Sequence, residues 1–300
     1  MQFLKTYTKN DFNLGKYHLL TVGYDYENDK IKEPSGFTET ERENNAIFIQ
    51  LTGENGRHNY RVSLRNDDNE QFGSHTTGHI AWGTSVTDKI RFNASFGTAF
   101  VAPSMIDLYS PFGANPELDP ERSKSFEFGI SGYHADIDWS VNIYKTEIKD
   151  MISLDNFFVP QNIAEANIKG VELLAATQLM GIDLTSQFSW LDPENNSGDL
   201  NDGKLLARRA RQTFTVDAYK SFGKFSLASK LFASGERYDN AANTRRLDGF
   251  ATVDLVGTYQ INKATNLQLK ASNLFDKEYE TVSGYNTDGT NFFISVNYTP

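Results

Sequence analysis

Few residues in this chain have the types and spacing that catalysis or tight metal binding requires. The 5 histidines are scattered, and none belongs to an HExxH, GxSxG or phosphate-binding glycine motif. They are His18, His58, His75, His79 and His134. Because the chain contains no cysteine, a thiol nucleophile, a disulfide scaffold and a cysteine zinc site are excluded. The sequence therefore indicates a protein that is not an enzyme and uses no cofactor.

A carboxylate-rich stretch offers oxygen ligands of the kind that calcium binds. It contains Asp192, Glu194, Asn196, Asp199 and Asp202. The spacing is not that of an EF-hand loop, so a solvated polar loop is the favoured interpretation. We predict no metal site.

Binding is the chemistry that the remaining polar and aromatic residues could perform. Arg208, Arg209 and Arg211 form a basic run. Two interpretations stay open: rim cations that pair with loop carboxylates, or groups that contact a ligand. Tyr238 and Tyr285 lie in polar stretches and are suited to packing on a large amphipathic ligand.

Charge and hydropathy narrow the classes of partner. The 300-residue chain has a formal net charge of −10 and a pI near 5.0, which argues against nucleic-acid binding through a basic face. No run of apolar residues approaches the roughly 20 that a membrane-spanning helix needs. The mean hydropathy of −0.51 suggests a water-soluble protein. That index is misleading for a membrane β-barrel, where about half of each strand faces a polar lumen.

The elements that must position these residues are β-strands. In the C-terminal hairpin Leu267, Leu269 and Ala271 alternate with polar residues, as strand side chains do. Similar alternation from Leu14 onward predicts about 14 long strands, and short turns alternate with long loops as in outer-membrane barrels. We therefore predict an all-β fold, a transmembrane antiparallel β-barrel. The predicted elements include strands at 14–26, 45–52, 60–64 and 208–222, and a polar loop at 66–75.

Four ordered segments carry a resemblance to a known family. They are 96–103 (Phe-Gly-Thr-Ala-Phe-Val-Ala-Pro), 115–129 (Asn-Pro-Glu-Leu-Asp-Pro-Glu-Arg-Ser-Lys-Ser-Phe-Glu-Phe-Gly), 168–172 (Ile-Lys-Gly-Val-Glu) and 273–279 (Asn-Leu-Phe-Asp-Lys-Glu-Tyr). With these segments the sequence resembles TonB-dependent outer-membrane receptors. The continuation at 280–289 is similar to the vitamin B12 (cobalamin) branch of that family.

The resemblance implies a fold and a location. These receptors lie in the Gram-negative outer membrane, surrounded by lipid, and have about 22 strands around a plug domain. Residues 1–300 would form the C-terminal part of such a barrel, a partial barrel of about 14 strands without the plug. We expect a fragment, since residues 2–9 lack the features of a signal peptide. Pro300 stands where such barrels usually end in an aromatic residue, so barrel closure is an open question.

The resemblance also implies a function. The intact receptor would take up cobalamin, driven by TonB, which would engage the N-terminal region that this chain lacks. Because 206–212 is similar to a strand start of the family, Arg208 would contact cobalamin, with Tyr238 and Tyr285 as further candidates. Strict alternation over 208–222 conflicts with this, since it places Arg208 on the lipid side unless a bulge or a position above the bilayer intervenes.

Two alternatives stay open. The chain could belong to a siderophore or haem receptor of the same family, which would bind a ferric siderophore or haem instead of cobalamin. It could also be a passive pore or surface-binding barrel without a plug.

Overall fold

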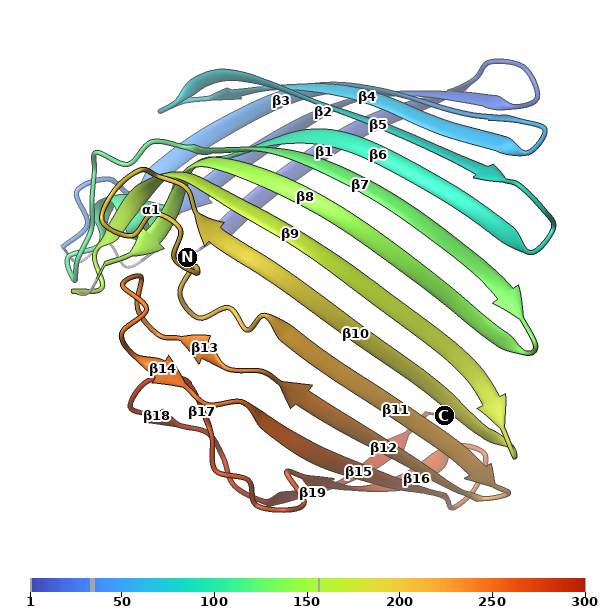
Figure 1. The fold of residues 1–300 in the computed structure, drawn as a ribbon. Coiled ribbons are helices and arrows are strands. Elements are labelled where there is room, and N and C mark those ends of the chain that lie inside the picture. The colour runs from blue at the N-terminus through green and yellow to red at the C-terminus, as the bar shows by residue number, and fades with distance from the viewer. Residues whose placement is uncertain (1, 33–35, 156, 300) are drawn as a thin grey trace. The chain divides into compact units, whose positions relative to one another are not determined.

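The computed structural model describes residues 2–32, 36–155 and 157–299, so the expectation about Pro300 lies outside the described residues. Most of the described chain is β-strand, with one short helix (Figure 1). The elements are β1 (Gln2–Asn13), β2 (His18–Lys30), β3 (Glu41–Asn55), β4 (His58–Asn69), β5 (Gly73–Ser85), β6 (Ile90–Val101), α1 (Met105–Tyr109), β7 (Glu121–His134), β8 (Ile137–Leu154), β9 (Pro160–Leu179), β10 (Ile182–Asn195), β11 (Gln212–Phe222), β12 (Phe225–Ser234), β13 (Arg237–Tyr238), β14 (Arg246–Leu247), β15 (Phe250–Gln260), β16 (Thr265–Ser272), β17 (Glu280–Val282), β18 (Tyr285–Asn286) and β19 (Asn291–Tyr298).

The strands follow one another in sequence order. Within the described residues, a 15-stranded sheet has the order β1 to β12, then β15, β16 and β19. Two short hairpins, β13 with β14 and β17 with β18, lie in the connections between its last strands. This confirms the predicted all-β antiparallel fold. Each predicted strand from Leu14 onward has its counterpart in the large sheet.

The chain divides into two compact units. The first comprises Met1–Gly129, Tyr144–Ile168 and Glu194–Gly203, and the second Ile130–Ile143, Lys169–Pro193 and Lys204–Pro300. The first unit contains β1 to β6 and α1, and the second contains β11 and all later strands.

In the first unit one face of the sheet is apolar and exposed. Ile49 on β3 lies opposite Val22 on β2 and Leu64 on β4. The side chains of these three residues are 41 to 56% exposed. Their sequence neighbours, such as Gln50 and Arg65, point to the other face because strand side chains alternate. Exposed aliphatic side chains of this kind fit the predicted contact with lipid.

The second unit repeats this division between two faces. Leu227, Gly257 and Leu269 lie side by side across β12, β15 and β16. On the opposite face Lys230 lies between Asp217 and Asp254, with its Nζ 3.8 Å from the Asp217 carboxylate. The charged face therefore contains carboxylates and an ammonium group on adjacent strands, as a polar lumen requires.

Short turns join the strands at one end of each hairpin. Ala135 and Asp136 both have positive φ, 48° and 63°, as do Met180 and Gly181, 52° and 72°. Positive φ at both central residues defines the type I′ turn, whose twist matches that of the flanking strands. The short connections predicted at these two positions are confirmed.

Some predicted element boundaries are wrong. Residues 66–75 are not a loop, because β4 runs to Asn69 and β5 begins at Gly73. Asn66 shows why: its Nδ2 donates to Ser74 Oγ and Thr76 Oγ1, both at 2.9 Å, so polar cross-strand pairs continue the ladder beyond the apolar residues. Strand β1 was not predicted, since its apolar positions do not alternate cleanly.

Helix α1 anchors the connection that follows β6. Ser104 caps it, and Asp107 completes the capping box by accepting from the Ser104 backbone. Met105 and Leu108 are fully buried, and Arg42 Nη1 donates to the Pro103 carbonyl at 2.7 Å. In the part of the chain that the structure covers, no helix has the length and apolar character to cross a membrane.

Candidate functional site

Three connections of the second unit contain the predicted binding residues. Residues 204–211 precede β11, residues 235–249 join β12 to β15, and residues 273–290 join β16 to β19 (Figure 1). All three lie opposite the short turns at Gly223 and 262–264, because long and short connections alternate along the meander. The structure therefore brings the three loops to the same end of their strands.

Arg208 does not lie on a strand, which corrects the prediction of a strand from 208. Strand β11 begins at Gln212, and Arg208 has a left-handed backbone conformation with φ of 61°. This conformation is unfavourable for a residue with a Cβ, and it is held by a 2.6 Å hydrogen bond from the Arg208 amide to the Tyr238 carbonyl. The conflict from strand alternation disappears, because alternation does not apply before β11.

Asp239 is the ion-pair partner of Arg208. Its side chain is 5% exposed and accepts from Arg208 Nε at 2.9 Å and from Arg245 Nη1 at 3.4 Å. Burial acts to raise the pKa of the Asp239 carboxyl. Hydrogen bonds from Arg208 and the Ser283 backbone, with the nearby positive charges, outweigh burial and lower the pKa below its ordinary value. Asp239 is therefore ionised at neutral pH.

The third loop presents Tyr285 on a short hairpin. Glu280 pairs with Asn286 and Val282 with Tyr285, and the Gly284 amide donates to Glu280 Oε2 at 3.0 Å. Tyr285 is 68% exposed, so its ring is available for contact. Strand β17 of this hairpin lies beside β14, which belongs to the same loop as Tyr238 and Asp239. The Tyr285 hairpin is therefore a neighbour of the loop that bonds to Arg208.

A second contact joins the first two loops. Asn243 Nδ2 donates to the Leu205 carbonyl at 2.8 Å, and the Leu205 amide donates back to Asn243 Oδ1 at 2.8 Å. The next residue, Leu206, is 3% exposed, and its amide donates to the Pro193 carbonyl. The loop before β11 is therefore fixed two and three residues ahead of Arg208.

An aromatic stack lies beneath the 235–249 loop. The rings of Phe250 and Tyr279 are 3.8 Å apart and nearly parallel, and the Arg237 guanidinium lies 5.7 Å from the Phe250 centroid. Arg237 Nη2 also donates to Ser234 Oγ at 2.6 Å. Burial lowers the pKa of Arg237, whose cation faces an aromatic ring.

The segment 273–279, which suggested the family, has a structural role. Asn273 is 5% exposed and has φ of 48°. Its Oδ1 accepts from the Lys277 amide at 2.9 Å, and its Nδ2 donates to the Lys277 carbonyl at 3.0 Å. Asp276 Oδ1 accepts from the Thr290 amide at 2.8 Å, across the loop. These side chains hold the base of the loop that carries Tyr285.

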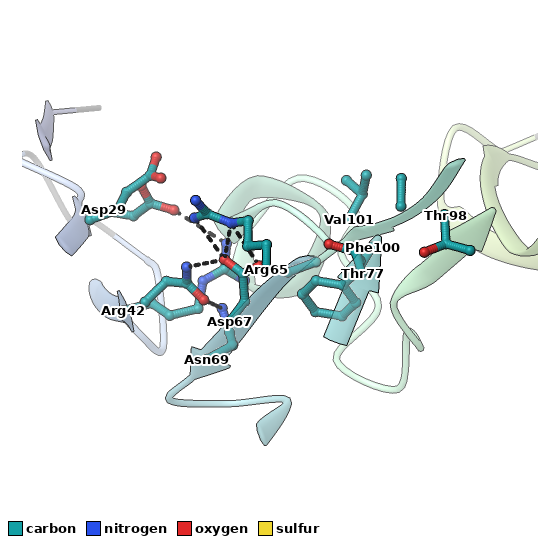
Figure 2. A pocket seen from close by; sticks show the side chains of 13 residues that line it. Asp29, Arg42, Arg65, Asp67, Asn69, Thr77, Thr98, Phe100 and Val101 are labelled. Atoms are coloured by element: carbon teal, nitrogen blue, oxygen red, sulfur yellow. Dashed lines mark hydrogen bonds and ion pairs between the residues drawn. The ribbon is translucent and has the colours of Figure 1, made fainter. Parts of the chain in front are cut away.

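The first unit contains a polar cavity of about 450 Å³ (Figure 2). Arginines of its lining form ion pairs with nearby carboxylates. Arg42 Nη2 lies 3.2 Å from Asp29 Oδ2, and Arg65 bonds to both Asp67 and Asp25. Asn44 and Asn69 complete the polar side, and Phe100 is on the other. The sequence analysis did not identify this cavity, whose residues come from five separate strands.

The carboxylate-rich stretch forms turns and an ion pair. Asp192 pairs with Arg211 at 2.9 Å. Asp199 and Asp202 accept from the amides of Asn201 and Gly198. Within the ranges that the structure describes, no three His, Asp or Glu side chains gather as metal ligands would.

Comparison with known proteins decides the family. Residues 2–274 match the family described as "TonB dependent receptor-like, beta-barrel". The chain belongs to the TonB-dependent receptor family. It is 33% identical over 293 residues to the vitamin B12 transporter BtuB of Vibrio vulnificus, covering 93% of this chain and 47% of that protein. It is 31% identical over 272 residues to BtuB of Photobacterium profundum, covering 87% and 44%.

Solved structures of TonB-dependent receptors share the fold. A mutant of the ferric enterobactin receptor PfeA from Pseudomonas aeruginosa aligns with a TM-score of 0.80 at 17% identity, over 99% of this chain and 53% of that chain. The chain spans about half the length of the curated relatives it matches.

Family membership establishes two further predictions. TonB-dependent receptors reside in the Gram-negative outer membrane, which is therefore the location of this chain. They are transport receptors and not enzymes, as the residue types indicated. Arg208, Tyr238 and Tyr285 were predicted from the sequence and stay predictions as ligand contacts, whereas Asp239 and Asn243 were not predicted. The only available signal for Asp239 was its position next to Tyr238.

Proposed function

We propose that residues 1–300 are the C-terminal barrel part of a receptor that takes up vitamin B12 (cobalamin) across the outer membrane. The observation that carries this proposal is the identity of 33% and 31% to two proteins named as vitamin B12 transporters. The matched stretches cover 93% and 87% of this chain, so the likeness extends along most of its strands and loops.

The candidate site has the chemistry that cobalamin requires. Cobalamin is a large amphipathic ligand with an apolar ring face, amide side chains and a phosphodiester. Tyr285, exposed on its hairpin, offers a ring for apolar packing. Arg208 offers guanidinium donors suited to phosphate or carbonyl oxygens. Tyr238 is adjacent to Asp239 and its carbonyl accepts from the Arg208 amide, so it lies in the same cluster.

The partners follow from this function. Uptake would require TonB, acting through an N-terminal region and plug domain outside the 300 residues, and the exposed aliphatic residues would contact outer-membrane lipid. A large ligand cannot pass a plugged barrel without such an input. TonB and outer-membrane lipid are therefore proposed as partners together with cobalamin.

A second candidate is a siderophore receptor, favoured by the structural likeness to a ferric enterobactin receptor. At 17% identity that likeness concerns the fold, which receptors of different substrates share. A passive pore without a plug is the alternative from a different class. It predicts conductance that does not depend on substrate or on TonB.

The test is binding to outer membranes that contain the protein. Labelled cyanocobalamin should bind saturably, and unlabelled cyanocobalamin, but not ferric enterobactin, should compete. Competition by the ferric siderophore alone would establish the second candidate. Membranes that bind neither ligand and conduct ions without TonB would establish the passive pore.

A further inference from the structure

Asp239 connects loops that are distant in sequence. It lies in the 235–249 loop with its side chain 5% exposed, yet its carboxylate accepts from Arg208 in the 204–211 loop. The geometry places one buried anion at the junction of these two loops.

Arg208 depends on this anion for its orientation. Asp239 accepts from Nε, the guanidinium nitrogen nearest the main chain, at 2.9 Å. A bond to Nε fixes the plane of the guanidinium group, because the other two nitrogens are rigidly attached to the same carbon. The backbone of Arg208 is fixed separately through its amide and the Tyr238 carbonyl. Both constraints come from adjacent residues, Tyr238 and Asp239.

We propose that Asp239 is the positioning residue of the ligand site, holding the Arg208 guanidinium in the orientation that a large ligand needs. This inference rests on the proposed function for the nature of the ligand. Its structural part, the coupling of the 204–211 loop to the 235–249 loop, does not depend on which ligand binds.

The test compares Asp239→Asn with Asp248→Asn in outer membranes containing the protein. Asn has the same shape as Asp but lacks the charge that pairs with Arg208 and Arg245. Asp248 is the matched control, because it lies in the same loop and forms an ion pair with Arg246 at 3.2 Å, but its side chain is 85% exposed. Hydrogen exchange of the loops is measured without ligand, and cyanocobalamin affinity is measured separately.

In Asp239→Asn, amide exchange should rise at Arg208, in a loop that was not mutated. Cyanocobalamin affinity should fall about 10- to 100-fold, because the charged hydrogen bond that orients Arg208 is lost. Asp239→Glu should recover part of the affinity, and Asp239→Asn should cost much less when Arg208 is already alanine. Asp248→Asn should change neither quantity.

The outcomes separate the two proposals. Unchanged exchange at Arg208 overturns the positioning role, as does faster exchange with full cyanocobalamin affinity. An equal cost of Asp239→Asn with and without Arg208 overturns it too. If the unmutated protein binds no cyanocobalamin but Asp239→Asn still raises exchange at Arg208, the coupling stands and the cobalamin assignment fails.

Discussion

The side-chain amide of Asn243 and the backbone of Leu205 hold each other through two hydrogen bonds of 2.8 Å, 38 residues apart in sequence. An amide side chain can imitate a strand partner in this way, since it offers one donor and one acceptor side by side. Asn243 has φ of 55°, a conformation that Asn tolerates better than most residues. The contact closes the 204–211 loop onto the 235–249 loop without a strand between them.

Removing this amide should loosen the loop that carries Arg208. Asn243→Gly keeps the left-handed backbone but removes the two hydrogen bonds to Leu205, each of which contributes about 0.5–1.5 kcal/mol. Residues 204–211 contain one lysine and several arginines, so trypsin reports their opening directly. Cleavage there should accelerate by roughly 5- to 150-fold if opening is loosened by about 1–3 kcal/mol. Ala242→Gly, the neighbouring change, should leave the rate near that of the unmutated protein, and equal acceleration in both variants would contradict the role of the amide.

Arg208 is predicted to contact the ligand. Arg208→Ala should weaken cyanocobalamin binding about 10- to 100-fold, because a hydrogen bond to a charged group contributes about 1.5–3 kcal/mol. Assembly into the outer membrane should be unchanged, since Arg208 lies before β11 and contributes nothing to the sheet. Arg211→Ala is the matched control: Arg211 pairs with Asp192 and lies 5.7 Å from the Trp190 ring. Unchanged affinity in Arg208→Ala, or equal losses in both variants, would reject the assignment.

Ligand affinity should depend on pH only in the acid range. The pKa of Asp239 is lowered from 3.8, so the ion pairs with Arg208 and Arg245 are complete above about pH 4. As the pH falls through the lowered pKa, the carboxyl takes up a proton and the loops lose this stabilisation. Affinity measured from pH 7 to 3 should therefore stay level to about pH 4 and then decline. In Asp239→Asn the affinity should be lower throughout, without that decline, whereas a midpoint near pH 6 in the unmutated protein would point to a histidine instead.

The strands were predictable because their signal is local. Side chains such as Leu267, Leu269 and Ala271 must alternate with polar neighbours wherever one face meets lipid and the other a polar lumen, so a short window of sequence contains the pattern. Strand ends were less predictable. At the ends, Tyr24 bonds to Asn45 and Tyr26 to Glu43, and such polar pairs extend the ladder without leaving an apolar alternation to detect.

The binding loops were only partly predictable, for a different physical reason. Arg208 and the tyrosines were proposed as candidates from residue type and resemblance, and their binding role stays a prediction. Asp239 was not proposed, because its partner Arg208 is far away in sequence and is brought near it only by the strands between them. The left-handed conformation of Arg208 gave no signal either, since no glycine or asparagine occupies the position. Strand alternation, extended back to Arg208, assigned this residue to the lipid side of a strand, although Arg208 lies before β11.

In the first unit the pair of Arg42 and Asp29 should behave as a buried ion pair. Both side chains are mostly buried, at 9% and 15% exposure, and Arg42 also holds the Pro103 carbonyl. Arg42→Met leaves the Asp29 carboxylate without that cation and should destabilise the fold by about 3–5 kcal/mol. The double variant Arg42→Met with Asp29→Leu should cost clearly less, because no buried charge is then unpaired. Guanidinium unfolding in detergent measures both, and additive losses would show that the two residues do not interact.

The exposed aliphatic face of the sheet in the first unit should tolerate a charged side chain far less than the opposite, polar face does. Ile49 and Gln50 are neighbours near the middle of β3 and point to opposite faces. Ile49→Arg places a guanidinium in lipid and should destabilise the protein by about 2–4 kcal/mol if the site lies near the bilayer midplane. Gln50→Arg places the same group on the polar face and should cost little. Folding into lipid vesicles, followed by guanidinium titration, measures the difference. Equal costs for the two substitutions would mean that the face containing Ile49, Val22 and Leu64 does not contact lipid, and a larger cost for Gln50→Arg would mean that the sheet presents its opposite face to the membrane.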